Sequence, residues 1–380
     1  MTPKRYPSHT SDSSPLGQPL KLKSPERQTR TNFSARGIPL KNLINAQNAG
    51  AEYDEPEAMG NSIILCEAKF EDKGFEAFNE LATAAKENGS LIVGQASHPG
   101  RQFEDRLQKN LISASNVMGM TFAKQHQASQ EEINRVVAGF AHAAEYLEKD
   151  LAQIFLQNTD QRTDSNGGSL ENRVRLIVEV AAELRKRVSG SFIVRIKIKS
   201  FEFREKGFSP EEAKDLCQAL EKDKFEFIES SGGTYESLAF KHKRKSTVKR
   251  KYFLIEFPEE IVKLLTMTKT YVTGGLKKVG AMFKALNTVD GVSIAGPACQ
   301  KFELPREILK GKTTGATKMQ LEDNEFGLTN VVAGTQIRHF GKDQQPRDLS
   351  AGGEKLGSDK ELVEYGYVDL SGATKPYIST

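Results

Sequence analysis

The stretch that decides the fold is FIVRIKIKSFEFREKGFSPEEAKDLCQALEKDKFEFIESSGG, residues 192–233. Its first part is an apolar run interrupted by charges, which predicts a strand at about 192–198. The middle part, SPEEAKDLCQALEKD, predicts a helix, and the last part predicts a second strand at about 225–230. Since a helix connects them, the two strands are expected to be parallel.

The same alternation continues along the chain in both directions. Downstream we predict a helix over 257–268, a strand at 270–273, a helix over 276–289 and a strand at 291–295. Upstream, SLENRVRLIVEVAAELRKRVSG (169–190) predicts a helix with Ser169 as its N-cap, and GFEAFNELATAAKENG (74–89) predicts another. Strict alternation of this kind indicates an α/β protein with a parallel sheet, either doubly wound or a (β/α)8 barrel.

The strand ends favour the barrel. A doubly wound dinucleotide-binding sheet would carry G-x-G-x-x-G after its first strand, and none of the strand ends has this motif. The strand at about 90–95 instead runs into a polar segment in LIVGQASHPGRQ (91–102), as the mouth of a ligand site would. We count five strands where a closed barrel needs eight, and none is predicted between residues 96 and 190. The expected fold is therefore a (β/α)8 TIM-type barrel that is incomplete.

Composition sets the wider limits. The chain has 380 residues, a net charge of +4 and 27% charged residues, which is ordinary for a globular protein. We expect an irregular N-terminal arm over 1–60, a barrel domain over 61–340 and a polar, poorly ordered tail over 341–380. Three widely spaced cysteines predict reduced thiols and a cytoplasmic protein, without a metal site. Neither a secretory signal nor a membrane span is predicted.

Five segments together resemble the old yellow enzyme family, the FMN-dependent NADH:flavin oxidoreductases. They are LIVGQASHPGRQ, QRTDSNGGSLENR (161–173), FIESSGGTYE (227–236), TYVTGGLKKVGAMFKAL (270–286) and DGVSIAGP (290–297). The resemblance covers roughly residues 60–340 and implies a (β/α)8 barrel that binds FMN at the carboxyl ends of its strands. It also implies NADPH or NADH as reductant and a small electrophilic substrate, such as an activated alkene or a quinone.

The resemblance assigns cofactor-binding residues. Gln95 matches the glutamine that binds the pyrimidine edge of the flavin, and Lys197 matches the cation beside flavin N1 and O2. Gly274 and Gly275 match the phosphate-binding loop after the seventh strand, and Ala295-Gly296 matches the phosphate loop of the last strand. Without the resemblance, the glutamine, the lysine and the glycines also fit ordinary loop, surface and turn positions. His98 is assigned to a loop, and 161–173 to a turn that starts a helix.

The chain also departs from the family pattern. The strand with a His-x-x-His or His-x-x-Asn pair is absent where FAHAAEYLEKD (140–150) runs into LAQIFLQNTDQRTD (151–164), so no catalytic residue is assigned. The opening strand with its threonine is missing around 26–40, and no apolar run marks the next strand in 45–61. Gly296 stands where the family has a phosphate-binding arginine. Either the chain is a diverged relative whose activity is lost, or its reading frame lacks coding segments.

A dense basic run, KHKRKSTVKRK, occupies residues 241–251. We interpret it as a solvated loop after the sixth barrel strand. The alternative is a non-catalytic binding protein that uses this run to bind nucleic acid on a degenerate barrel. Because no aromatic residues suited to base stacking are interleaved with the charges, nucleic-acid binding is the weaker interpretation.

Overall fold

The computed structural model describes part of the 380-residue chain. The described residues are 5–6, 16, 33–35, 79, 83, 98, 111–115, 125–150, 164–199, 210–231, 257–319, 329, 332–333, 336 and 344–350. Within them, the main feature is a five-stranded sheet in the order β1-β7-β6-β5-β4. Its strands are β1 (Phe33–Ala35), β4 (Arg195–Lys199), β5 (Phe227–Ser231), β6 (Lys269–Thr273) and β7 (Gly291–Ile294).

Every pairing in this sheet is parallel, as the strand–helix alternation predicts. Four of the five predicted strands are confirmed, with shifts of a few residues at their ends. The fifth, at about 90–95, lies outside the described residues. In the described part of the chain the sheet does not close, because β1 and β4 form its two ends. This agrees with the expectation of an incomplete barrel.

Three short strands were not predicted. β1 lies in the arm expected to be irregular and within residues 26–40, where the opening strand was expected to be missing, so that expectation is wrong. It pairs in parallel with β7, Ser34 opposite Ser293. The prediction of no strand between residues 96 and 190 is wrong, because β2 (Leu111–Ser113) and β3 (Gln125–Gln127) form a separate parallel pair there. Each has three residues, which is too short for a period of two to be visible in the sequence.

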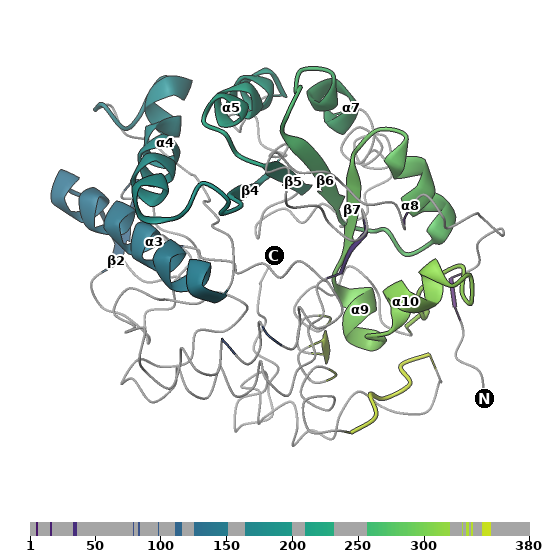
Figure 1. The fold of residues 1–380 in the computed structure, drawn as a ribbon. Helices are drawn as coiled ribbons and strands as arrows, with labels where there is room; N and C mark the ends of the chain where they lie inside the picture. The colour runs from purple at the N-terminus through teal and green to yellow at the C-terminus, as the bar shows by residue number, and fades with distance from the viewer. Residues whose placement is uncertain are drawn as a thin grey trace.

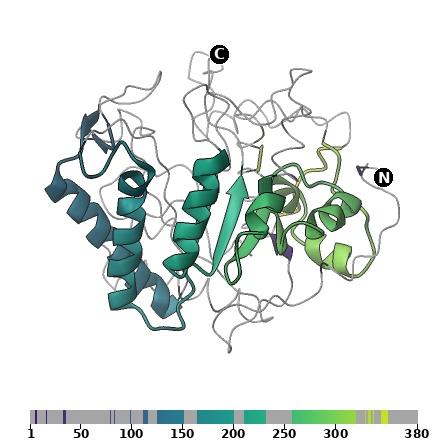
Figure 2. The ribbon, with the colours of Figure 1, turned by 90° about the horizontal axis from the view of Figure 1, so that it is seen from above.

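Helices pack on one face of the large sheet or against one another beside it. They are α3 (Gln130–Asp150), α4 (Leu170–Arg187), α5 (Pro210–Lys222), α7 (Phe257–Val262), α8 (Val279–Leu286), α9 (Gly296–Gln300) and α10 (Leu304–Leu309). Figure 1 shows α5, α7 and α8 around the outside of the curved strands. Figure 2, turned by 90°, shows α3 and α4 packed side by side at one end and α8 to α10 at the other. Of the predicted helix 74–89, Asn79 and Thr83 are described, and both are helical.

Two hydrogen-bonding side chains set helix ends. The Ser169 hydroxyl accepts from the Asn172 N–H at 3.3 Å, so the predicted N-cap of α4 is confirmed. Helix α7 ends at Val262, six residues before its predicted end. The backbone N–H groups of residues 266–268 instead donate to the Glu221 carboxylate of α5 at 2.6 to 3.0 Å. This carboxylate diverts three donors from helical bonding and fixes the turn into β6.

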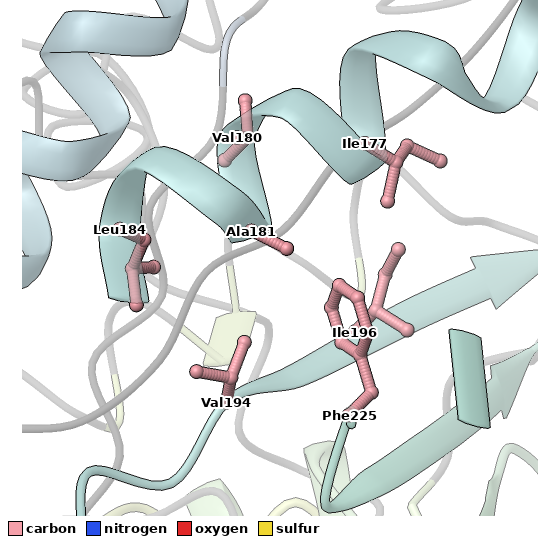
Figure 3. Close-up of a pocket in the computed structure, with 7 residues that line it drawn as sticks. All are labelled: Ile177, Val180, Ala181, Leu184, Val194, Ile196 and Phe225. Atoms are coloured by element: carbon pink, nitrogen blue, oxygen red, sulfur yellow. The ribbon is translucent and has the colours of Figure 1, made fainter. Parts of the chain in front are cut away.

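Apolar residues between helices and sheet form the core. One cluster joins α3, α4 and α5 to Ile196, Ile198 and Ile228, and a second joins α8, α9 and α10 to Val272 and Val292. Figure 3 shows an apolar hollow between α4 and the sheet. It is lined by Ile177, Val180, Ala181, Leu184, Val194, Ile196 and Phe225. No polar side chain lines it, so it belongs to the core and not to a binding site.

Within the segment predicted as a poorly ordered tail, residues 344–350 are described. The Arg347 N–H donates to the buried Gln336 side chain at 3.0 Å, and Leu349 is buried. The basic run 241–251 lies outside the described residues. Within the described ranges, no helix combines the length and the apolar content needed to cross a membrane.

Candidate functional site

Alternation along the strands separates a helix-covered face from an inner face. Ile196, Ile198 and Ile228 pack in the cluster beneath α4 and α5. Their neighbours Lys197 and Glu229 therefore point to the opposite face, because side chains alternate along a strand. We call this opposite face the inner face. One row of cross-strand partners runs across it, from Lys197 to Glu229, Tyr271 and Gly291.

Three charged side chains meet in and beside this row, and we call them the inner charge cluster. The Lys197 ammonium lies 3.5 Å from Oε1 of Glu229, and Nη1 of Arg195 donates to Oε2 of the same carboxylate at 3.0 Å. Glu229 is fully buried, whereas the side chains of Arg195 and Lys197 retain 10% and 20% of their exposure. A buried carboxylate needs such partners, since an unpaired charge in the interior is costly.

Aromatic rings pack beside the charges. The rings of Phe227 and Tyr271 lie 5.2 Å apart, and the Arg195 guanidinium lies 5.4 Å from the centre of the Phe227 ring. With Ile193 these two aromatic residues form a small buried cluster. Opposite Tyr271 the row ends at Gly291, where the ring occupies the space that a Cβ atom would need. The Phe227 ring thus packs between the Arg195 guanidinium and the Tyr271 ring.

Two glycine-containing turns follow neighbouring strands at the carboxyl edge of the sheet. Gly274 (φ +122°) and Gly275 (φ +66°) come directly after β6, and Ala295 and Gly296 come directly after β7. Because Thr273 pairs with Ser293, the two turns lie at adjacent strand ends. β4, which carries Lys197, is two strands from β6, or about 10 Å at ordinary strand spacing. Gly274, Gly275, Ala295 and Gly296 thus lie at the carboxyl edge, whereas Lys197 lies in the middle of β4, in the row that reaches Gly291 at the start of β7. Gln95 lies outside the described residues.

Among the histidines that the structure describes, His98, His126 and His142, none forms a pair at this edge. His142 lies in helix α3, and His126 in β3 bonds the Glu132 carboxylate at 2.9 Å. His98 lies in irregular backbone, as predicted, and burial lowers its pKa. The predicted absence of a strand carrying His142 therefore holds for the described residues, whereas the segment 151–163 lies outside them.

Comparison with known proteins identifies the family. The model of the NADH:flavin oxidoreductase / NADH oxidase family matches residues 50–282. NADH-dependent flavin oxidoreductase nadA of Aspergillus parasiticus is 38% identical over 393 residues, which cover 90% of this chain and 88% of that protein. The chain belongs to the NADH:flavin oxidoreductase family. The resemblance inferred from the five sequence segments is therefore confirmed.

Solved structures agree on the fold. The old yellow enzyme homologue from Zymomonas mobilis superposes with a TM-score of 0.60 and 15% identity, covering 90% of this chain and 99% of that chain. 2-Naphthoyl-CoA reductase in complex with 2-naphthoyl-CoA gives a TM-score of 0.64 and 15% identity, covering 88% of this chain and 56% of that one. The fold is the (β/α) barrel of the old yellow enzymes. By family, the protein is an FMN-dependent NAD(P)H oxidoreductase, and no comparison supports the nucleic-acid alternative.

The described residues of this NADH:flavin oxidoreductase fit FMN at two places. Lys197 offers a half-buried ammonium group on the inner face. At Gly274 and Gly296 an added Cβ would meet no atom within 4 Å, so the backbone there borders open space. A cation suits the pyrimidine edge, and open backbone suits a phosphate. In the residues that the structure describes, no group of three or more His, Cys, Asp or Glu side chains could hold a metal ion.

The described part of QRTDSNGGSLENR, residues 164–173, makes the structural contacts expected of a turn that starts a helix. Asn166 is buried and donates to the Gln130 side chain at the start of α3 at 3.2 Å. Asn172 donates to the Gly167 carbonyl at 3.1 Å, and Gly168 has a φ of +78° that favours glycine. The segment therefore ties the beginning of α4 to α3 and makes no contact with the inner charge cluster among the described interactions.

Arg195 and Glu229 were not predicted as site residues from the sequence. Arg195 lies in FIVRIKIK and Glu229 in FEFIESS, where charged or polar residues alternate with apolar ones in part of each strand. The strand pattern predicts that Glu229 shares a face with Phe227. It does not predict the pairing with Arg195 and Lys197, which lie more than thirty residues earlier in the chain and meet Glu229 through the register of β4 and β5.

Proposed function

We propose that this chain binds FMN along the carboxyl edge of the β4–β7 sheet and reduces a small conjugated electrophile, an activated alkene or a quinone, with NADH or NADPH. The observation that carries the proposal is Lys197, a half-buried cation on the inner face of the same sheet whose carboxyl edge carries Gly274, Gly275 and Gly296. FMN held there would supply hydride chemistry, the transfer of a hydride from NAD(P)H to the acceptor, which also takes up a proton.

The residues of the chain have distinct parts in this function. The Lys197 ammonium offsets negative charge at the pyrimidine edge of the cofactor, together with Gln95 by family resemblance. Backbone N–H groups at Gly274, Gly275 and Gly296 bind the phosphate. Because Gly296 replaces the arginine of the family, one charge-assisted phosphate contact is missing. Such a contact is typically worth about 1.5–3 kcal/mol, or roughly ten- to a hundredfold in affinity. We therefore propose weak FMN binding and slow reduction.

The first test is FMN binding and reduction by the purified chain. FMN affinity is measured by flavin fluorescence, and reduction is followed anaerobically with NADH and then NADPH. Lys197→Met should weaken binding or slow reduction, because it removes the inner-face cation. Lys186→Met is the matched control, since Lys186 lies on the outer surface of α4 with 71% of its side chain exposed. A Lys197→Met protein that binds and is reduced like the unaltered chain would refute this assignment, as would an unaltered chain that binds no FMN.

The second test restores the missing arginine. At Gly296 an added side chain meets no atom within 4 Å, and the backbone has no positive φ, so Gly296→Arg can be accommodated. It should tighten FMN binding about tenfold or more if the phosphate lies there. Gly190→Arg is the control, because Gly190 also borders open space and lies at the other end of the strands, before β4. Equal effects of the two arginines would indicate nonspecific charge.

The cytoplasmic location predicted from the cysteines stays a prediction. Cys217 and Cys299 are buried free thiols, and burial raises their pKa to about 12 and about 11. Both are therefore protonated and unreactive at neutral pH, which fits a structural role for them.

A further inference from the structure

We infer that Glu229 is a positioning residue that holds the Lys197 ammonium on the inner face, and that Arg195 and Glu229 together set the charge that bound FMN experiences. The inference rests on the proposed function, because it assigns a role to residues beside the flavin-binding cation. It concerns the two side chains that the family pattern did not assign.

The geometry shows one carboxylate shared between two cations. Its Oε1 faces the Lys197 ammonium at 3.5 Å, and its Oε2 accepts from Arg195 at 3.0 Å. Because each oxygen faces a different cation, the orientation of the carboxylate fixes the position of both. The long lysine side chain has many rotamers in water, and pairing with a fully buried anion restricts them.

The two cations are not equivalent. Arg195 is the more buried, and its guanidinium lies 5.4 Å from the centre of the buried Phe227 ring. Lys197 keeps twice the side-chain exposure, 20% against 10%. Arg195 is thus placed as the fixed counter-charge of Glu229, and Lys197 as the cation that a ligand reaches.

The charge balance gives the cluster its effect. Together the three groups carry one net positive charge. If Glu229 were alone with Lys197, the pair would be neutral and would stabilise an anionic ligand poorly; Arg195 compensates Glu229, so that the charge of Lys197 remains effective. A role in packing alone does not require ions, because apolar residues of similar volume stabilise a core equally well or better.

Substitutions that change the charge should shift the reduction potential of bound FMN in opposite directions. Glu229→Gln leaves two positive charges, favours the more negative reduced cofactor and raises the potential. Arg195→Met leaves no net charge and lowers it. We expect each shift to correspond to about a tenfold change in the ratio of reduced to oxidised cofactor, about 30 mV for a two-electron couple. A purely structural role would impair both variants without this opposition of sign.

The experiment is an anaerobic titration of the full chain at saturating FMN against a reference dye. Glu183→Gln is the matched control, because the Glu183 carboxylate also binds two cations, Lys186 at 2.8 Å and Arg187 at 3.0 Å, but on the surface of α4. It should leave the potential unchanged. Shifts of the same sign for Glu229→Gln and Arg195→Met, or no shift in either, would overturn the inference while leaving FMN binding intact.

Two further measurements keep the inference testable if a single variant fails to fold. The double variant Arg195→Met/Glu229→Gln removes one charge of each sign from the cluster and keeps its net charge of one positive, so its potential should return to that of the unaltered chain. In the protein without FMN, a double-mutant cycle on urea unfolding with Glu229→Gln and Lys197→Met should show coupling. A chain that binds no FMN refutes the proposed function and the charge-setting role, whereas zero coupling refutes the positioning role by itself.

Discussion

Replacing Gly291 with alanine tests the packing beneath the inner charge cluster. An ideal Cβ at this position lies 2.3 Å from Cε1 and 2.6 Å from Cζ of Tyr271. Ordinary carbon–carbon contacts are about 3.5–4.0 Å, so the ring would have to move by more than about 1 Å. Tyr271 is 5% exposed and its ring packs 5.2 Å from that of Phe227, which leaves little room for this shift.

The expected net loss of stability is about 1–2 kcal/mol. Overpacking a well-packed core costs about 1–3 kcal/mol, and the lower backbone entropy of alanine in the unfolded chain returns roughly 0.5–1 kcal/mol. Urea unfolding followed by far-ultraviolet circular dichroism measures the change, since the chain contains no tryptophan for fluorescence. Gly190→Ala is the control, because its Cβ would meet no atom within 4 Å. It should change stability little.

A double-mutant cycle identifies the cause. In a Tyr271→Ala background the ring is gone, and Gly291→Ala should no longer destabilise the protein. A Gly291→Ala protein as stable as the unaltered chain would show that the close approach of β6 and β7 is wrong. So would the same loss with and without the Tyr271 ring.

Three further predictions concern the scaffold, and urea unfolding measures each. Ser169→Ala removes the hydroxyl that caps Asn172 and should cost about 0.5–2 kcal/mol, whereas Ser169→Asn should retain most of the stability. Leu184→Ala leaves a cavity at a fully buried position of α4 and should cost about 2.7–5 kcal/mol; a loss below 1 kcal/mol would mean that α4 does not pack on the sheet. Partial burial raises the pKa of Glu221, but the N–H groups of residues 266–268 outweigh it and lower that pKa overall. The ionised Glu221 carboxylate therefore contributes its full stabilisation above the unfolded pKa near 4.5, and this contribution is lost as pH falls toward the lower folded pKa. Glu221→Gln should destabilise the protein at pH 7 and make the free energy of unfolding depend less on pH in this acid range.

The sequence predicted the elements that show a long, regular period. Helix α4 has eighteen residues and a clear apolar face, and β4 to β7 alternate with helices in the expected order. The three-residue strands β1, β2 and β3 have no period to detect, so their pairing depends on contacts between distant residues. The predicted end of α7 was wrong for a similar reason. The turn after the helix is held by Glu221, which lies more than forty residues earlier in the chain.

The candidate site was predicted in part. Family resemblance gave Lys197 and the glycine positions as cofactor-binding residues, which stays a prediction; the structure shows Lys197 on the inner face and Gly274, Gly275 and Gly296 after the strands β6 and β7. A left-handed backbone at Gly274 is the physical reason for glycine there. Glu229 could not be assigned, because a single carboxylate in an apolar strand does not reveal its partners. Only the register of β4 and β5 brings it to Arg195 and Lys197.

That register couples the site to the core. In β4 the inner Lys197 alternates with Ile196 and Ile198, which pack beneath α4 and α5. A slip of one residue would bury the lysine under the helices and turn the isoleucines to the inner face, so the core and the site specify the same register. Substitutions on the helix-covered face should therefore weaken FMN binding only as far as they unfold the protein. Substitutions in the inner charge cluster should change the potential of bound FMN even where stability is retained, and this contrast separates a working flavin site from a barrel that merely keeps its ancestral fold.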